Sequence, residues 1–194
     1  MSVSSYRARR TTSMQSGAWH VLVTAGYAIE RSCTHRREQA QADFARKAME
    51  VLPSDEATSY EPSPRGLVIA AETELSLERP VRRLREVYGD MVRIGPPRVR
   101  YRKSDRIEQP IIGLRVLCAH EHYEPIRSDL RLRRGVIVDT EVTRTFGIIR
   151  ACAPMTMLLG YPDALKEMSQ GRAHLVMWLS HYEQLDDPPP LDAA

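Results

Sequence analysis

The sequence predicts an α+β protein that consists of two ferredoxin-like βαββαβ units in tandem, each a split βαβ sandwich. Two observations lead to this fold class. Short runs of alternating apolar and polar residues, typical of half-buried strands, are separated by longer stretches with apolar residues every three or four positions, typical of amphipathic helices. This order occurs twice along the chain. With 194 residues, 42% of them hydrophobic, the chain is long enough for two cores of roughly 80 residues each.

The first half begins with a segment that has no hydrophobic periodicity. Residues 1–18 are therefore predicted to be a disordered leader. Residues 19–29 are rich in β-branched and aromatic side chains, which favours a strand. Thr34 is expected to cap a helix over residues 35–52, which ends at Pro53 because proline cannot continue a helix.

A strand and a second helix are expected next. Turn residues at 62–66 precede the apolar run 67–71, which is predicted to be a buried strand. The helical spacing of apolar residues predicts a helix over residues 75–88. Pro80 fits this helix if the regular part begins near Arg79, because proline is tolerated in a first turn.

Arginines alternate with apolar residues where the first half closes. Val99 and Tyr101 lie between basic residues, which predicts a strand with one charged face. That face either contacts an anion or is an ordinary solvated surface. Its members are Arg98, Arg100, Arg102 and Lys103. The polar connection 103–109 is a candidate boundary between a first domain over residues 19–103 and a second over residues 109–184.

The second half repeats the order of elements with a different sequence. Gly135 is expected to end its first helix, and the proline-rich tail over residues 185–194 is predicted to be disordered. The expected elements are a strand over 112–118, a helix over 121–134, strands over 136–142 and 146–153, a helix over 155–168 and a strand over 173–179.

Composition and charge are compatible with an anionic partner. The formal net charge is +3 and the isoelectric point is about 8.9. Only three of the 28 basic residues are lysine, and the rest are arginine. This bias follows either from GC-rich coding or from a role in contacting phosphates and bases, for which the planar guanidinium is well suited.

Cysteine usage and hydropathy indicate a cytoplasmic protein without membrane contact. Cys33, Cys118 and Cys152 are far apart and have no CxxC spacing, which favours a reducing compartment. The apolar stretch over residues 18–29 is too short to cross a bilayer.

Several uncommon short motifs follow one another in the second half. In chain order they are Asp129-Leu130, Arg133-Arg134-Gly135, Gly160-Tyr161, Ser169-Gln170-Gly171-Arg172 and His181-Tyr182. This series resembles domain V, the C-terminal domain of elongation factor G. Motifs in the first half resemble domain III of the same factor. They are Ala28-Ile29-Glu30, Glu74-Leu75-Ser76-Leu77-Glu78, Gly95-Pro96-Pro97 and Tyr101-Arg102.

The resemblance implies a translation-related, ribosome-associating protein. It implies ribosomal RNA and stalk-base proteins as partners, with a separate GTPase subunit as a further partner. The G domain, domain II and domain IV of the factor have no counterpart in the motif series. The sequence contains no GxxxxGK[ST] phosphate loop and no asparagine for a guanine-reading motif. We therefore expect neither GTP binding nor any other cofactor.

The candidate RNA contacts lie on one helix and in one loop. Arg127, Arg131 and Arg134 fall within about 60° of one another at 100° per residue, so they form a stripe. Gly171 permits close backbone approach to a partner. A solvated helix face and a plain turn are the alternative interpretations. The full candidate set is Arg127, Arg131, Arg133, Arg134, Gln170, Gly171 and Arg172.

No enzymatic chemistry is predicted. His120-Glu121-His122 has no third ligand at metal-binding spacing, so no metal site is expected. No serine or cysteine has a recognisable base partner. Besides a ribosome-associating protein, two hypotheses remain: a fragment or split subunit of a translational GTPase, and a ferredoxin-like regulatory protein that binds a small ligand.

Overall fold

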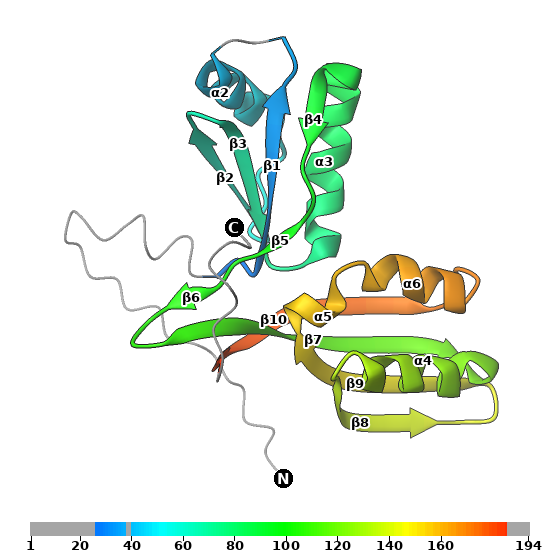
Figure 1. The fold of residues 1–194 in the computed structure, drawn as a ribbon. Coiled ribbons are helices and arrows are strands. Elements are labelled where there is room, and N and C mark those ends of the chain that lie inside the picture. The colour runs from blue at the N-terminus through cyan, green and yellow to red at the C-terminus, as the bar shows by residue number, and fades with distance from the viewer. Residues whose placement is uncertain (1–25, 38–39, 186–194) are drawn as a thin grey trace.

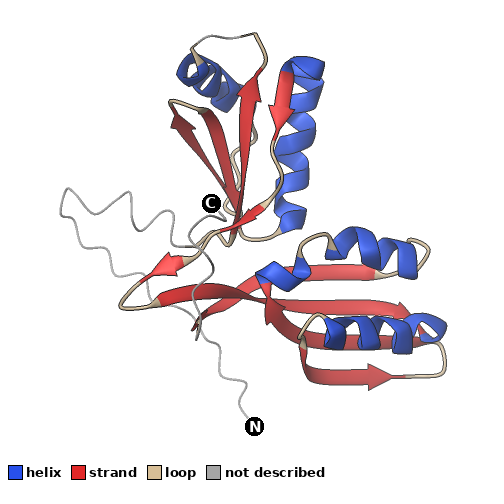
Figure 2. Cartoon of the chain, viewed as in Figure 1, coloured by secondary structure: helices blue, strands red, loops and turns tan. Residues whose placement is uncertain are grey.

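The computed structural model describes residues 26–37 and 40–185 and contains two antiparallel sheets, each with helices on one face (Figures 1 and 2). Each sheet has five strands. The predicted fold class, two ferredoxin-like units in tandem, is confirmed. The predicted disordered leader, residues 1–18, lies outside the described residues, and so does the predicted tail beyond Leu185.

The first sheet has the strand order β2-β3-β1-β4, and β5 pairs with the start of β1. Its core face follows the two-residue period of the strands, because Ile29 pairs with Ala71 and Cys33 with Leu67, and all four are fully buried. The strands are β1 (Ile29–His35), β2 (Thr58–Ser63), β3 (Gly66–Ala71), β4 (Val92–Ile94) and β5 (Arg98–Val99).

Two helices cover that face, α2 (Gln41–Val51) and α3 (Glu74–Tyr88), and the short 3-10 helix η1 (Gly89–Met91) follows α3. Their buried residues recur at helical spacing, which places them on the stripe that meets the sheet. They are Phe44, Ala45 and Ala48 on α2 and Leu77, Pro80, Val81 and Leu84 on α3. The outer side of α3 is left to charged residues.

The second sheet has the order β10-β7-β9-β8, which is the same permutation as the first when strands are numbered within each half. The short strand β6 pairs with the start of β7. The strands are β6 (Arg102–Lys103), β7 (Ile107–Ala119), β8 (Val136–Val142), β9 (Phe146–Pro154) and β10 (His174–Gln184).

Helices α4 (His120–Leu132), α5 (Met155–Leu158) and α6 (Tyr161–Met168) cover one face of this sheet. Tyr123, Ile126 and Leu130 of α4 are buried against it. Gly147 of β9 leaves room for Tyr123, since a Cβ there would lie 2.4 Å from the ring. The opposite face keeps large apolar side chains partly exposed, among them Leu117, Val176 and Trp178.

The two halves meet where α3 begins and the second half turns from α5 to α6 (Figure 1). The backbone N–H of Gly160 donates a hydrogen bond to Glu74 Oε2 at 2.7 Å. Glu74 also lies 3.9 Å from the Arg31 guanidinium. The carboxylate of Glu74 therefore links the first sheet, α3 and the second half of the chain.

The start of the first unit differs from the prediction. Strand β1 begins at Ile29, the last residue of the expected strand 19–29, and residues 19–25 lie outside the described part. Thr34 is in β1 and does not cap a helix, because Cys33 to His35 pair with β4. Helix α2 therefore begins at Gln41, six residues later than expected. Sheet pairing overrides the local capping preference here.

Proline and glycine positions explain two further corrections. Helix α3 is regular from Glu74, so Pro80 lies inside it rather than in its first turn. The lost backbone hydrogen bond is tolerated because the ring of Pro80 is buried in the core. The single helix expected over residues 155–168 is two helices, α5 and α6, since Gly160 adopts a left-handed conformation with φ of 72° between them.

The structure differs from the predicted strands at three places. Strands β2 and β4 have no expected counterpart, because β2 is polar and β4 has only three residues. The strand expected around Val99 is divided between β5 and β6, which belong to different sheets. The expected connection 103–109 is partly a hairpin, in which Lys103 pairs with Ile107. The domain bounds 19–103 and 109–184 remain a prediction.

Candidate nucleic-acid interface

Helix α4 carries its arginines on the flank of its buried stripe. Tyr123, Ile126 and Leu130 face the sheet, and a residue one position further on is rotated by about 100° around the helix axis. Arg127 and Arg131 lie on this flank, and Arg131 is exposed whereas Arg127 is half-buried. The helix ends at Leu132, so Arg134 extends the stripe from the turn beyond the helix.

The end of α4 is a Schellman motif that holds Arg134 in a left-handed conformation. The N–H of Gly135 donates to Leu130 O at 2.8 Å, and the N–H of Arg134 donates to Arg131 O at 3.0 Å. Arg134 has φ of 58°, a region that glycine prefers. Gly135 is required for close packing, because a Cβ there would lie 2.6 Å from Leu130 O. This backbone turns Arg134 away from the helix.

Two guanidinium groups at this end are available to a partner. Within the described residues, the side chains of Arg131 and Arg134 form no hydrogen bond or ion pair, and both residues are exposed. Leu132 lies between them with 81% of its surface exposed, and Val136 follows at 68%. The surface therefore combines unpaired positive charge with exposed apolar side chains. We call Arg131, Leu132 and Arg134 the α4 terminal surface.

Arg133 is directed into the protein instead. Its Nε donates to Asp129 Oδ2 at 2.7 Å, and an Nη donates to Met157 O at 3.0 Å. The guanidinium lies over the ring of Tyr161, 5.2 Å from the centroid. Burial raises the pKa of the Tyr161 hydroxyl, an effect that Arg133 partly offsets. Arg133 was predicted to contact RNA, but its side chain instead holds α4, α5 and α6 together.

Arg127 has an intermediate environment. One of its Nη atoms donates to the Glu124 carboxylate at 3.2 and 3.3 Å, one helical turn earlier. Its side chain is 30% exposed. Because that charge already has a carboxylate partner, Arg127 offers less to an anion than Arg131 does.

The loop predicted as the second contact ends α6 in the same way as Gly135 ends α4. The N–H of Gly171 donates to Lys166 O at 2.7 Å, and the N–H of Gln170 donates to Glu167 O at 3.2 Å. Gln170 has φ of 52° and Gly171 has φ of 74°. Within the described residues, Arg134 and Gln170 are the two non-glycine residues with positive φ, and both belong to the predicted candidate set.

The structure separates the predicted residues into two groups. Arg172 donates to Glu121 Oε1 at 3.2 Å and to Gln170 Oε1 at 2.6 Å, which places this loop beside the start of α4. Arg134 follows the end of α4. Thirteen helical residues separate the two positions, a length of about 20 Å. The candidate residues therefore form two surfaces at opposite ends of α4.

Two of the four residues of the predicted basic strand face, Arg100 and Arg102, have carboxylate partners. Arg100 lies 3.5 Å from Glu30 and 3.3 Å from Glu61. Arg102 pairs with Glu108 at 2.6 Å, and its guanidinium lies 4.7 Å from the centroid of the Tyr182 ring. These carboxylates come from strands β1, β2 and β7, so the pairing could not be inferred from the alternating sequence alone.

The described residues contain neither a metal cluster nor a membrane-spanning helix. No group of three or more His, Cys, Asp and Glu side chains there is placed to hold a metal ion. Among the helices of residues 26–37 and 40–185, none combines the length and apolarity needed to cross a bilayer.

Helix α3 carries a group of arginines that the sequence patterns did not single out, and these line a cleft.

Comparison with known proteins bears on the second half. Residues 106–192 match the family model described as elongation factor G C-terminus. This half of the chain is similar to the C-terminus of elongation factor G. Elongation factor G 1 of Syntrophomonas wolfei is 34% identical over 79 residues, which is 41% of this chain and 12% of that protein. Elongation factor G of Orientia tsutsugamushi strain Boryong is 40% identical over 76 residues, 39% of this chain and 11% of that protein.

A structural comparison extends the likeness in fold to both halves. The crystal structure of a protein from Thermus thermophilus superposes with a TM-score of 0.57 at 15% identity, and the match covers 87% of this chain and 42% of that one. The resemblance to elongation factor G is thus confirmed in sequence over the C-terminal half, and the matched region is about an eighth of those relatives' length. The resemblance of the first half to domain III in sequence remains a prediction.

Proposed function

We propose that this chain is a non-enzymatic, cytoplasmic protein that associates with the ribosome through its elongation factor G-like second half. The observation that carries the proposal is the family match over residues 106–192. The unpaired arginines of the α4 terminal surface add a physical means of contact. The proposed partners are ribosomal RNA and the proteins at the base of the ribosomal stalk.

The α4 terminal surface would contact RNA mainly by charge. Arg131 and Arg134 have no carboxylate partner within the described residues, so a phosphate would not have to displace one. A guanidinium fits a phosphate with two parallel hydrogen bonds. Each phosphate contact also releases counterions, so the affinity should fall with salt. Exposed Leu132 can pack against a sugar or base once the charges have docked.

The loop of Gln170, Gly171 and Arg172 would form a second contact about 20 Å from the first, judged from the length of α4. Arg172 already has Glu121 and Gln170 as partners. Its contribution to RNA affinity should therefore be smaller than that of Arg131. The left-handed turn instead offers backbone groups to a closely approaching partner.

The proposal assigns no nucleotide chemistry to the chain itself. The sequence has no phosphate loop of the GxxxxGK[ST] type, the element that cradles phosphates in such GTPases. Any coupling to GTP hydrolysis would then come from a separate GTPase partner. The purified chain should release no phosphate from GTP above a buffer blank, and in a competition filter assay it should not prefer GTP to other nucleoside triphosphates.

Ribosome co-sedimentation tests the proposal. Purified chain should pellet with 70S ribosomes at low salt and be released as salt increases. The double variant Arg131→Glu with Arg134→Glu should bind at least tenfold more weakly, because two contacts become repulsive. The matched control is Arg106→Glu with Arg115→Glu, which changes net charge equally at exposed arginines elsewhere in the same half.

Measured at about 0.15 M salt, where the Debye length is about 8 Å, the control should bind within about threefold of the wild-type chain, because charges outside the contact are screened. If the wild-type chain stays in the supernatant at low salt, the proposal is wrong. If both double variants lose binding equally, the contact is non-specific attraction and the α4 terminal surface is not the site.

A further inference from the structure

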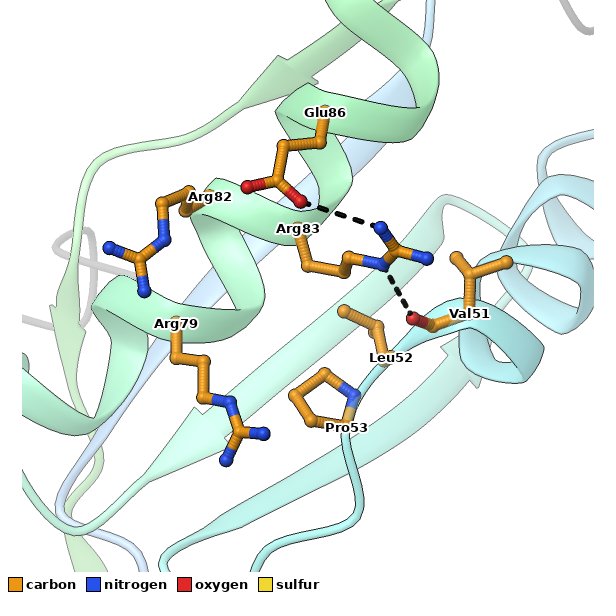
Figure 3. A pocket seen from close by; sticks show the side chains of 7 residues that line it. All are labelled: Val51, Leu52, Pro53, Arg79, Arg82, Arg83 and Glu86. Atoms are coloured by element: carbon orange, nitrogen blue, oxygen red, sulfur yellow. Dashed lines mark hydrogen bonds and ion pairs between the residues drawn. The ribbon is translucent and has the colours of Figure 1, made fainter.

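A cleft between the end of α2 and the outer side of α3 is lined mostly by arginine and apolar residues (Figure 3). Its volume is about 270 Å³. It lies in the first half of the chain, away from the elongation factor G match at residues 106–192. The lining residues are Val51, Leu52, Pro53, Arg79, Arg82, Arg83 and Glu86.

The helical period brings the charged lining residues together. Arg79, Arg82, Arg83 and Glu86 are spaced at i, i+3, i+4 and i+7 on α3, so they occupy one face of the helix within about 100° of rotation. The core residues Leu77, Val81 and Leu84 occupy the opposite face. The arginines therefore stand on the side of α3 that the core does not use.

Arg83 connects the two walls of the cleft. Its Nε donates to Val51 O at 3.2 Å, and an Nη lies 3.4 Å from Glu86 Oε2 (Figure 3). Val51 is the last residue of α2, whose terminal carbonyls lack helical partners. Arg83 thus satisfies one of these carbonyls and holds α3 against the end of α2, which defines one wall of the cleft.

Arg79 and Arg82 are free to act on a ligand. Both are exposed, and within the described residues neither side chain makes a hydrogen bond or an ion pair. Arg79 extends toward the side of the cleft where Pro53 lies (Figure 3). The Tyr60 hydroxyl donates to Pro53 O at 2.7 Å. Burial raises the pKa of this hydroxyl, and the charge of Arg79 lowers it in part.

The balance of charge around the cleft favours an anion. Its lining contains three arginines and one carboxylate, Glu86, which is directed at Arg83. Asp55 is near enough to raise the pKa of Tyr60, but its carboxylate accepts the N–H of Ala57 at 2.7 Å. Glu78 and Glu86 lie one turn before and after Arg82 on α3, but within the described residues neither Arg79 nor Arg82 forms an ion pair with a carboxylate.

We propose that this arginine cleft binds a phosphate group, with Arg79 and Arg82 as its ligands and Arg83 as a positioning residue. Two planar guanidinium forks suit the several oxygens of a phosphate better than a single carboxylate. The half-buried Leu52 and Pro53 offer an apolar wall for the group that carries the phosphate. A free polyphosphate compound and the backbone of RNA share this chemistry, and the site is separate from the α4 terminal surface.

Titration with two probes tests the proposal. Inorganic tripolyphosphate is titrated into the full chain by calorimetry at low salt, and a fluorescein-labelled single-stranded RNA of twelve nucleotides is followed by anisotropy. The variant is Arg79→Gln with Arg82→Gln. The control is Arg65→Gln with Arg93→Gln, which removes the same charge from exposed arginines of the same half. Circular dichroism checks that each variant is folded.

We expect the cleft variant to lose at least tenfold in tripolyphosphate affinity while the control stays within twofold of wild type. RNA affinity that falls at least threefold in the cleft variant alone identifies the RNA backbone as the source of the phosphate. RNA affinity that is equal in the two variants, together with the tripolyphosphate loss, identifies a free phosphate compound. Equal losses in both variants with both probes, or no binding of either probe by the wild-type chain, overturns the proposal.

Discussion

Arg131 and Arg133 are two residues apart at the end of α4, and their guanidinium groups have opposite roles. Arg133 bonds Asp129 and Met157 O and lies over Tyr161, whereas Arg131 has no side-chain partner within the described residues. We expect Arg133→Ala to lower the free energy of unfolding by about 1–2 kcal/mol, because a partly exposed ion pair, a hydrogen bond and a cation–π contact are lost together.

Arg131→Ala serves as the comparison, and its effect on unfolding should stay within about 0.5 kcal/mol. Urea denaturation followed by circular dichroism measures both. Equal destabilisation by the two substitutions would contradict the structural role of Arg133.

The buried thiol of Cys33 makes stability depend on alkaline pH. Burial raises the pKa of Cys33 from 9.0 to about 12. Between these values the unfolded thiol loses its proton and the folded one keeps it. The contribution of Cys33 is therefore complete below pH 9 and is lost as the pH rises toward 12, at up to about 1.4 kcal/mol per pH unit.

The measurement is the free energy of urea unfolding at several pH values between about 9 and 11 for the wild-type chain and for Cys33→Ala. The unfolding free energy should fall less steeply with pH in the variant, by up to about 1.4 kcal/mol per pH unit, the slope that one proton gives. At neutral pH the variant should be less stable than the wild-type chain, because the smaller side chain leaves a cavity. Parallel pH profiles would show that the thiol ionises equally in both states.

At the scale of elements, α4 and α6 end in the same motif, with a non-glycine residue in the left-handed position before a glycine. We expect Arg134→Gly to raise the free energy of unfolding by about 1 kcal/mol, since glycine adopts φ of 58° without strain. Gly135→Ala should lower it by more than about 2 kcal/mol, because its Cβ would lie 2.6 Å from Leu130 O.

Thermal unfolding of the two variants measures these opposite shifts. The stabilised variant Arg134→Gly should at the same time bind ribosomes more weakly, because it lacks a contact. A gain in ribosome affinity would contradict the proposed contact of Arg134, and a loss of stability would contradict strain at its left-handed backbone.

The strand–helix pattern was predictable, and several boundaries were not. Strand β8 has its expected bounds, 136–142, because its pattern needs only local alternation. The start of α2 was misplaced because the pairing of His35 with Val92 is set by a strand nearly sixty residues away. The same limit applies to the α4 stripe: its spacing was predictable, but the contacts of Arg133 with Met157 and Tyr161 depend on the packing of α5 and α6.

The α3 arginines illustrate what sequence patterns could have found. Arg79, Arg82 and Arg83 have the helical spacing of one face, so a stripe could have been predicted there as it was on α4. The cleft could not, because its other wall is the end of α2, which lies almost thirty residues earlier. The left-handed φ of Arg134 and Gln170 was also unpredictable, since both residue types disfavour it.

At the scale of the whole molecule, Glu74 joins the two halves by accepting the Gly160 N–H. We expect Glu74→Ala to speed hydrogen exchange at the Gly160 amide at least tenfold, because the donor loses its partner. The control is Glu78→Ala, one turn further along α3 at an exposed carboxylate. Amide exchange by NMR measures both, and an unchanged Gly160 rate in Glu74→Ala would show that this bond does not protect the amide.

The similarity of residues 106–192 to the elongation factor G C-terminus leads us to propose that the chain binds the ribosome where that part of the factor binds, and so competes with it. The direct measurement is displacement: fluorescent elongation factor G is held on 70S ribosomes with a non-hydrolysable GTP analogue, and the unlabelled chain is titrated in. The wild-type chain should displace the factor. The Arg131→Glu, Arg134→Glu variant should require at least tenfold more protein, and the Arg106→Glu, Arg115→Glu control should match wild type. Binding of the chain and the factor to the same ribosome without competition would contradict the proposal.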